Sequence, residues 1–221
     1  MTRYAVIGAS SGTGQQIVTH LAERGIPVRA ISRNPRPTQG SVEPYAADVT
    51  DAAALAQALQ GEFDAVFYTA DIHGRGHKRD AIRAVMYEGC VNAIRAAEAA
   101  GTKRFMLLSV IAPDRFSWVW WVLDALKPGM RRNIRDREQA LKESALPYVI
   151  CRAPRLNDRP AHTVPVAATR PERRLDMKRG IARADLARVL VRAAEDAPDG
   201  TIWDVYADPL GPVPVWLESM A

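Results

Sequence analysis

The sequence predicts a doubly wound α/β domain, in which helices cover both faces of a parallel sheet. Short apolar strand candidates alternate along the chain with amphipathic helical stretches, which is the pattern of such a sheet. The first strand candidate, Arg3–Ile7, leads through a glycine-rich turn into a helix over Gly14–Arg24. The 221 residues suffice for one large domain and are too few for two ordinary ones. We therefore expect a single domain over residues 1–221, with a less regular segment over residues 155–221.

The remaining elements follow in order along the chain. Val, Ile, Tyr and Phe are enriched in the further strand candidates, which are Val28–Ile31, Val42–Ala46, Ala65–Thr69, Phe105–Ser109, Tyr148–Cys151 and Thr201–Tyr206. Helical spacing of apolar residues marks Ala52–Gln60, Arg79–Ala100, Arg132–Ser144 and Ala184–Glu195. Asp51 should cap the helix that follows it, and Gly25 and Gly101 should end helices in a left-handed conformation. The charged, proline-containing stretch Arg155–Gly180 is expected to be a long connection.

Composition narrows the class of protein. The formal net charge is +5, but the basic residues are spread along the chain and form no single patch with interleaved aromatic residues. This favours attraction of an anionic cofactor or substrate over nucleic-acid binding. No secretory leader and no apolar run long enough to cross a bilayer are recognised, so we expect a cytoplasmic protein. Cys90 and Cys151 lack metal-ligand spacing and are expected to be buried apolar residues, with no metal bound.

A glycine pattern between the first strand and the first helix indicates a dinucleotide-binding turn. Gly8 permits a tight turn, Gly12 lets the backbone approach a pyrophosphate, and Gly14 lets helix and strand pack closely. The helix amino terminus then presents unpaired N–H groups to the phosphates. The other residues expected to bind cofactor in this turn are Ser10, Ser11 and Thr13. The alternative is a flexible loop without a ligand.

The end of the second strand bears on which nicotinamide cofactor is bound. NAD-binding folds place an acidic residue there for the ribose hydroxyls, whereas this chain offers Arg33 and no carboxylate before Glu43. An arginine can pair with a 2′-phosphate, so NADP(H) is expected to be preferred over NAD(H). The alternative is a solvent-facing loop arginine. Residues that follow later strands are expected to border the adenine or the ribose, and these are Asp48, Val49, Thr69 and Ala70.

Taken together, these motifs resemble the atypical branch of the short-chain dehydrogenase/reductase superfamily, which has a Rossmann-type fold. The resemblance extends over about Tyr4 to Glu195. It is carried by the Gly8–Gly14 turn and by Ser32-Arg33-Asn34-Pro35, Asp48-Val49-Thr50-Asp51, Tyr87-Glu88-Gly89, Gly101-Thr102-Lys103-Arg104-Phe105 and Leu146-Pro147-Tyr148. Within the branch, the chain is similar to the NAD(P)H-binding group that contains flavin/biliverdin reductases and NmrA-like redox-sensing proteins.

The resemblance fails at the proton-transfer pair of the superfamily, a Tyr and a Lys four residues later. In this sequence, the positions of that Tyr and Lys fall near Met130 and Ile134. No Tyr-x-x-x-Lys occurs between Ser109 and Ser144. An unactivated ketone needs a proton donor when it is reduced, whereas a flavin, a quinone or a conjugated tetrapyrrole spreads the developing charge over its own π-system. The sequence thus favours an oxidoreductase that acts on a planar conjugated acceptor. A non-catalytic NADP(H) sensor and a non-redox tailoring enzyme (an isomerase or cyclase) remain alternatives.

Three polar residues are candidates for contact with the substrate. Ser109 ends the fifth strand, where the family places a substrate-contacting serine, and it is expected to donate a hydrogen bond. Asp71 and His73 follow the fourth strand and can shuttle a proton, unless their loop is simply solvated.

The segment Trp118–Trp121 holds three tryptophans that cannot all point inward from one helix. It is expected to meet a flat ligand, a partner subunit or a lipid surface, with core packing as the alternative. A homodimer is left open.

Overall fold

The computed structural model describes residues 2–38, 40–72, 74, 76–115, 117–171, 174–175 and 180–220. At its centre lies an eight-stranded sheet with the order β3-β2-β1-β4-β5-β6-β10-β8. Its strands are β1 (Tyr4–Ile7), β2 (Val28–Ser32), β3 (Val42–Ala46), β4 (Ala65–Tyr68), β5 (Phe105–Val110), β6 (Tyr148–Ala153), β8 (Val166–Thr169) and β10 (Thr201–Ala207). The strands pair in parallel except β8, which runs antiparallel to β10. The predicted fold class is confirmed.

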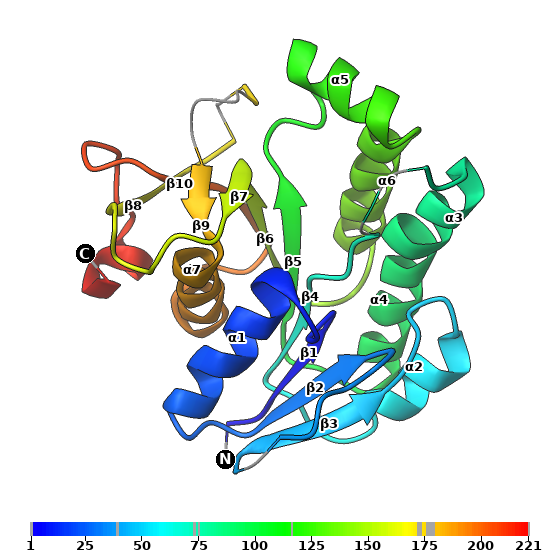
Figure 1. Ribbon diagram of the computed structural model, residues 1–221. Coiled ribbons are helices and arrows are strands. Elements are labelled where there is room, and N and C mark those ends of the chain that lie inside the picture. Colours follow the sequence, from blue (N-terminus) through cyan, green and yellow to red (C-terminus); the bar gives the residue numbers. More distant parts are fainter. Residues whose placement is uncertain are drawn as a thin grey trace.

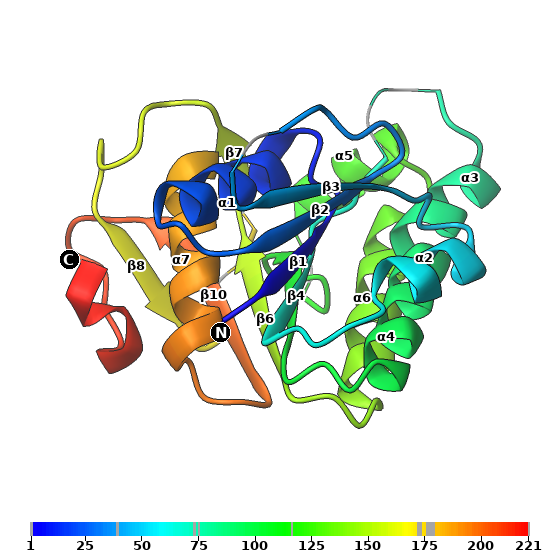
Figure 2. The ribbon, with the colours of Figure 1, turned by 90° about the horizontal axis from the view of Figure 1, so that it is seen from below.

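Helices cover both faces of this sheet, as Figures 1 and 2 show. One face carries α1 (Gly12–Glu23) and α7 (Arg183–Asp196), which pack against each other. The other carries α2 (Ala52–Ala58), α4 (Gly89–Ala99) and α6 (Met130–Lys142). A buried apolar cluster fills each interface between helices and sheet, and removal of these side chains from water favours folding.

The strand order places a topological switch point in the middle of the sheet. The chain winds outward from β1 through β2 to β3, then returns to β4 on the other side of β1. In open α/β sheets, ligands bind outside the carboxyl ends of the strands at such a point. Local signals predicted from the sequence are also present: the Asp51 side chain accepts from the N–H of Ala54, and Gly25 and Gly101 adopt φ of 67° and 66°.

The helical stretch expected over Arg79–Ala100 is interrupted by a π turn. The structure has α3 (Arg79–Arg83), the π turn η1 (Ala84–Glu88) and then α4. A π turn displaces backbone carbonyls from regular helical bonding. Here the Tyr68 hydroxyl donates to the carbonyl of Val85 at 3.0 Å. The π turn holds one residue more than a regular helical turn. It therefore shifts α3 relative to α4, beside the carboxyl end of β4, where Tyr68 lies.

The expectation of a simple connection over Arg155–Gly180 was wrong. The segment contains β7 (Arg155–Asn157) and β8, and its last residue begins β9 (Gly180–Ala182), which pairs in parallel with β7. A Cβ on Gly180 would lie 2.9 Å from the carbonyl oxygen of Arg155, so glycine is what permits this pairing. Pattern reading missed these strands because each has only three or four residues.

Two further helices complete the described chain: α5 (Trp118–Leu126), and the 3-10 helix η2 (Val215–Met220) near its end. No helix in the described ranges is long and apolar enough to cross a membrane. Cys90 and Cys151 are free and buried, as expected, and burial raises the pKa of each thiol to about 12.

Candidate functional site

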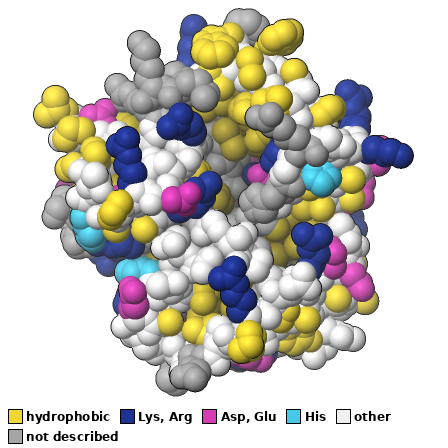
Figure 3. Space-filling model, in the orientation of Figure 1, with side chains coloured by type: hydrophobic (Ala, Val, Ile, Leu, Met, Phe, Trp, Pro, Cys, Tyr) yellow, Lys and Arg dark blue, Asp and Glu magenta, His cyan; other side chains and the backbone are white. Residues whose placement is uncertain are grey.

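A cleft of about 670 Å³ opens along the carboxyl edge of the sheet, over the switch point between β1 and β4. Figure 3 shows this face of the molecule hollowed near its middle. The cleft is lined by the residues predicted to bind cofactor, with the exception of Gly14: Gly8, Ser10, Ser11, Gly12, Thr13, Arg33, Asp48, Val49, Thr69 and Ala70. Ser109 and Asp71 also line it. His73 lies outside the described residues.

The glycine turn has little space for side chains at two of its three glycines. A Cβ on Gly8, whose φ is +91°, would lie 2.8 Å from the backbone nitrogen of Ala70. A Cβ on Gly14 would lie 2.3 Å from the carbonyl oxygen of Gly8 and 2.5 Å from Oγ1 of Thr69. Gly14 is therefore the point where α1 packs onto the end of β1. Gly12 differs, since the nearest atom to its Cβ would be Nε of Arg183 at 3.7 Å.

The residues of this turn fit a dinucleotide pyrophosphate. The N-cap residue Ser11 makes no side-chain hydrogen bond to the first turn of α1, which leaves the helix N–H groups for a ligand. The hydroxyl oxygen of Thr13 is buried and has no partner among the described residues. Arg183, at the start of α7, places a guanidinium beside Gly12 and pairs with Asp158 at 2.7 Å. Sequence reading missed Arg183, because the turn and α7 meet only in the folded chain.

At the end of β2, Arg33 is exposed and lines the cleft next to buried Ser32. In the described part of the chain, no acidic side chain forms an ion pair with Arg33. Asp48 lies across the same end of the cleft, where its Oδ1 accepts from the N–H and the hydroxyl of Thr50 at 2.9 and 2.8 Å. This end of the cleft therefore carries the guanidinium of Arg33 and the carboxylate of Asp48, which is held by Thr50.

Ser109 lies at the opposite end, within a buried polar network. Its hydroxyl donates to Oε1 of Glu138 at 2.5 Å, and Arg152 donates to the same carboxylate from Nε at 3.0 Å and from Nη2 at 2.6 Å. Ser109 and Arg152 are direct neighbours in the β5–β6 pairing, which aligns them toward the α6 residue Glu138. The hydroxyl proton is thus directed at Glu138, so in this arrangement Ser109 offers the cleft an acceptor lone pair and not the donor that the sequence predicts.

Asp71 also lies in the cleft wall, but its carboxylate is engaged. Oδ2 pairs with Nζ of Lys127 at 3.2 Å, and Oδ1 accepts from the N–H of Ile72 at 2.7 Å. Lys127 immediately follows α5, so this pair ties the loop after β4 to the helix above the cleft. His77 also lines the cleft.

The wall between Ser109 and the loop after β4 is mainly apolar. Met130 and Ile134, near which the resemblance predicts the positions of the superfamily's Tyr and Lys, both line the cleft from α6. Further apolar lining comes from Ile72, Ala81, Ala84, Val85, Met86, Val110, Pro154 and Leu156. The guanidinium-bearing side chain of Arg137, which is 4% exposed, also lines this wall.

The three tryptophans of α5 divide between core and surface, as their spacing predicts. Trp120 is buried and donates from Nε1 to the carbonyl of Ile111 at 3.2 Å, whereas Trp118 and Trp121 are 64% and 74% exposed. Figure 3 shows hydrophobic side chains gathered over α5, at the top of this face. None of the three tryptophans is among the residues that line the described cleft.

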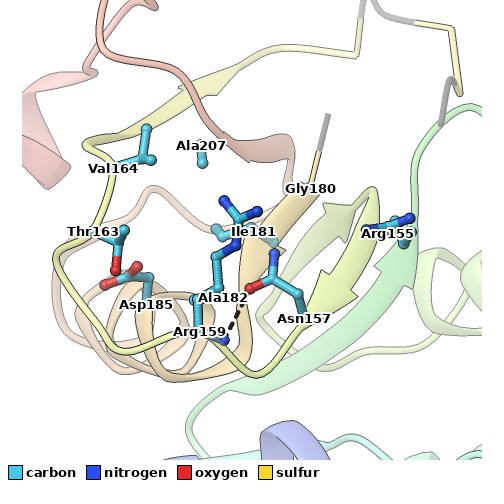
Figure 4. Close-up of a pocket in the computed structure, with 10 residues that line it drawn as sticks. All are labelled: Arg155, Asn157, Arg159, Thr163, Val164, Gly180, Ile181, Ala182, Asp185 and Ala207. Carbon is cyan, nitrogen blue, oxygen red and sulfur yellow. Dashed lines mark hydrogen bonds between the residues drawn. The ribbon is translucent and has the colours of Figure 1, made fainter. Parts of the chain in front are cut away.

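A second, smaller cavity of about 230 Å³ lies between β7, β9 and the start of α7 (Figure 4). Two of its polar side chains are engaged locally: Asn157 accepts from the N–H of Arg159 at 3.1 Å, and Asp185 accepts from the N–H of His162 at 2.9 Å. No group of three or more His, Cys, Asp or Glu side chains in the described ranges is placed to hold a metal. The large cleft is therefore the candidate site.

A dinucleotide-binding turn at the switch point of a doubly wound sheet defines a Rossmann-type NAD(P)-binding protein. Residues 8–197 match the family described as NAD(P)H-binding. The chain therefore belongs to this family, and it is an atypical short-chain dehydrogenase/reductase-like protein, as the resemblance implied.

Curated relatives agree with this assignment. An uncharacterized sugar epimerase, YhfK, from Bacillus subtilis is 30% identical over 202 residues, which cover 86% of this chain and 87% of that protein. A 3-beta-hydroxysteroid dehydrogenase from Mycolicibacterium neoaurum is 33% identical over 113 residues, which cover 47% of this chain. That match spans only 31% of the dehydrogenase's own length.

Solved structures show the same fold. A putative NAD-dependent epimerase/dehydratase from Bacillus halodurans superposes with a TM-score of 0.78 at 22% identity, covering 99% of this chain and 100% of that one. ChuY, described as an anaerobillin reductase from Escherichia coli O157:H7, superposes with a TM-score of 0.71 at 20% identity, covering 96% and 100% of the two chains.

Proposed function

We propose that this protein is an NADP(H)-dependent oxidoreductase that reduces a planar conjugated acceptor, such as a flavin or a quinone, by direct hydride transfer. The observation that carries this proposal is the make-up of the cleft. A glycine turn and basic residues lie at one end, and an apolar wall lies at the other, where Met130 and Ile134 stand in place of a proton-transfer pair.

The cofactor end supports NADP(H) over NAD(H). The amino terminus of α1, with Gly12 and the nearby Arg183, receives the pyrophosphate. Arg33, which has no acidic partner among the described residues, receives the 2′-phosphate, because a guanidinium forms charge-assisted hydrogen bonds to phosphate oxygens. Asp48 and Val49 border the adenine, and Thr69 and Ala70 line the ribose.

The apolar end supports a flat, conjugated acceptor. When bound, the nicotinamide supplies a hydride, that is, two electrons and one proton. The apolar side chains of α6 and η1 exclude water and hold the acceptor ring against the nicotinamide. The second proton comes from solvent, because a delocalised acceptor anion needs no strong acid at the moment of transfer. The description of the structural neighbour ChuY as a reductase is consistent with this proposal.

The test is consumption of NADPH with a panel of acceptors. Absorbance at the nicotinamide band is followed with flavin, quinone and tetrapyrrole acceptors, and nucleotide binding is measured in parallel by fluorescence. We expect NADPH to be oxidised by at least one acceptor class. Tight NADPH binding without oxidation by any acceptor would overturn the reductase proposal in favour of a sensor or a non-redox enzyme.

A further inference from the structure

A buried guanidinium that forms no ion pair with a described residue lies in the apolar wall of the cleft. Arg137 is 4% exposed, and its Nη2 donates to the backbone carbonyl of Leu108 at 3.0 Å. Its Nε is buried and has no hydrogen-bond partner among the described residues. The side chain nevertheless lines the cleft, on the same helix as Met130 and Ile134.

The neighbouring acidic groups do not compensate this charge. Both carboxylate oxygens of Glu138, the next residue in sequence, accept hydrogen bonds from Arg152. Asp71, across the cleft, pairs with Lys127. In the described ranges, no carboxylate forms an ion pair with Arg137.

Two buried ionisable side chains that interact electrostatically with Arg137 are neutral. The electrostatic field of Arg137 reaches Tyr68 and Cys90, and burial raises the pKa of both, that of Cys90 to about 12. Both groups therefore carry no charge at neutral pH. A charge in such surroundings is unfavourable for folding, because the guanidinium loses its hydration and gains, among the described residues, one backbone acceptor.

Deepening the proposed function, on which this inference rests, we propose that Arg137 binds an anionic substituent of the acceptor. The substrate class is then a planar conjugated molecule that bears a carboxylate or a phosphate. The ring lies against the apolar wall formed by side chains such as Met130 and Ile134, and the anion pairs with the guanidinium. A guanidinium suits this role because it stays protonated and forms paired hydrogen bonds to planar anions.

The position of Arg137 separates it from the cofactor's phosphates. Arg33 lies at the end of β2, and Arg183 lies beside Gly12 at the start of α1. Arg137 instead projects from α6 beside β5, the strand that carries Ser109. It is thus at the end of the cleft where the acceptor, and not the adenosine half of the cofactor, is proposed to bind.

The experiment uses pairs of probes that differ in charge and share a ring system. FMN is compared with riboflavin, and anthraquinone-2-carboxylate with its carboxamide, each binding to protein saturated with NADP⁺. In wild-type protein the anionic member of at least one pair should bind about tenfold more tightly, the gain of one charge-assisted contact. Arg137→Met should abolish that preference and leave the affinities for the neutral member and for NADPH within about twofold, because the shared ring contacts remain.

Two controls keep the test decisive. Arg132→Met removes an exposed arginine of the same helix, with its side chain 82% exposed, and should leave the preference intact. Thermal denaturation without ligand should show Arg137→Met to be at least as stable as wild type, since a buried uncompensated charge is replaced by an apolar side chain.

The proposal is overturned if wild type binds neither member of either pair, shows no preference for the anionic members, or keeps its preference in Arg137→Met. Turnover is measured separately with the same probes. Selective binding of the anionic probes without NADPH oxidation would uphold the Arg137 subsite and refute the reductase function.

Discussion

Replacing Gly14 by alanine sets two opposite effects against each other in α1. Alanine is favoured over glycine inside a helix by about 1 kcal/mol, so helix propensity alone predicts a more stable protein. The added Cβ would, however, lie 2.3 Å from the carbonyl oxygen of Gly8, a backbone atom that no rotamer change can move. Overpacking of this kind typically costs about 1–3 kcal/mol, and the backbone contact places Gly14→Ala at the upper end of that range. We therefore expect a net destabilisation of about 2 kcal/mol.

Urea denaturation measures this difference directly, through the shift of the unfolding midpoint at constant slope. Thr19, exposed in the same helix, gives the matched control: Thr19→Ala compared with Thr19→Gly reports helix propensity without a clash. Because the clash forces α1 away from β1, Gly14→Ala should also weaken NADPH binding. A Gly14→Ala protein that is as stable as wild type, or more so, would refute the close approach of α1 to the end of β1.

Other changes test further parts of the structure. The Cβ of Gly12→Ala would meet no close atom, but the residue must adopt a φ of +57°. We therefore expect a loss of about 1 kcal/mol in stability and a larger loss in NADPH affinity. Equal losses of affinity for NADPH and for a ligand that does not bind at the glycine turn would contradict this expectation. The hydrogen bond from Arg29 lowers the pKa of the Glu43 carboxyl. Glu43→Gln should therefore reduce the free energy of unfolding at pH 7 by up to about 1 kcal/mol. This difference from wild type should vanish as the pH falls below the lowered pKa, where Glu43 is protonated. Burial raises the thiol pKa of Cys90 and Cys151 to about 12, so a thiol reagent at pH 8 should label neither in the native protein and both after denaturation.

The parts of the fold that depend on local sequence were predicted well. The glycine turn, the Asp51 cap and the strands from β1 to β6 follow from signals within a few residues, because turn chemistry and side-chain periodicity act over that range. The short strands of the 155–180 segment were missed, since pairing of β7 with β9 is decided by tertiary contact. The π turn in the long helical stretch likewise depends on Tyr68, which reaches it from another element.

In the candidate site, too, the residues that follow from local sequence signals were predicted, and those that depend on tertiary contacts were missed. Residues of the Gly8–Gly14 turn were identified from spacing alone, and the structure places them in the cleft, apart from Gly14, which packs behind it. Arg183 was missed because α7 is far along the chain from the turn that it faces. Ser109 was predicted to contact the substrate, and it lines the cleft, but the direction of its hydrogen bond depends on Glu138, and a single sequence does not reveal that contact. Arg137 was not singled out from the sequence, because its burial is a tertiary property.

Equilibrium binding of NADPH and NADH to wild type and to Arg33→Ala tests the central claim most directly. We expect one site per chain for each nucleotide, at least tenfold tighter binding of NADPH, and loss of that preference in Arg33→Ala, because the 2′-phosphate contact is a charge-assisted pair. NADH affinity should change little in the variant. Failure to bind either nucleotide would contradict the assignment of the cleft, and an equal loss of both affinities in Arg33→Ala would contradict the role given to Arg33.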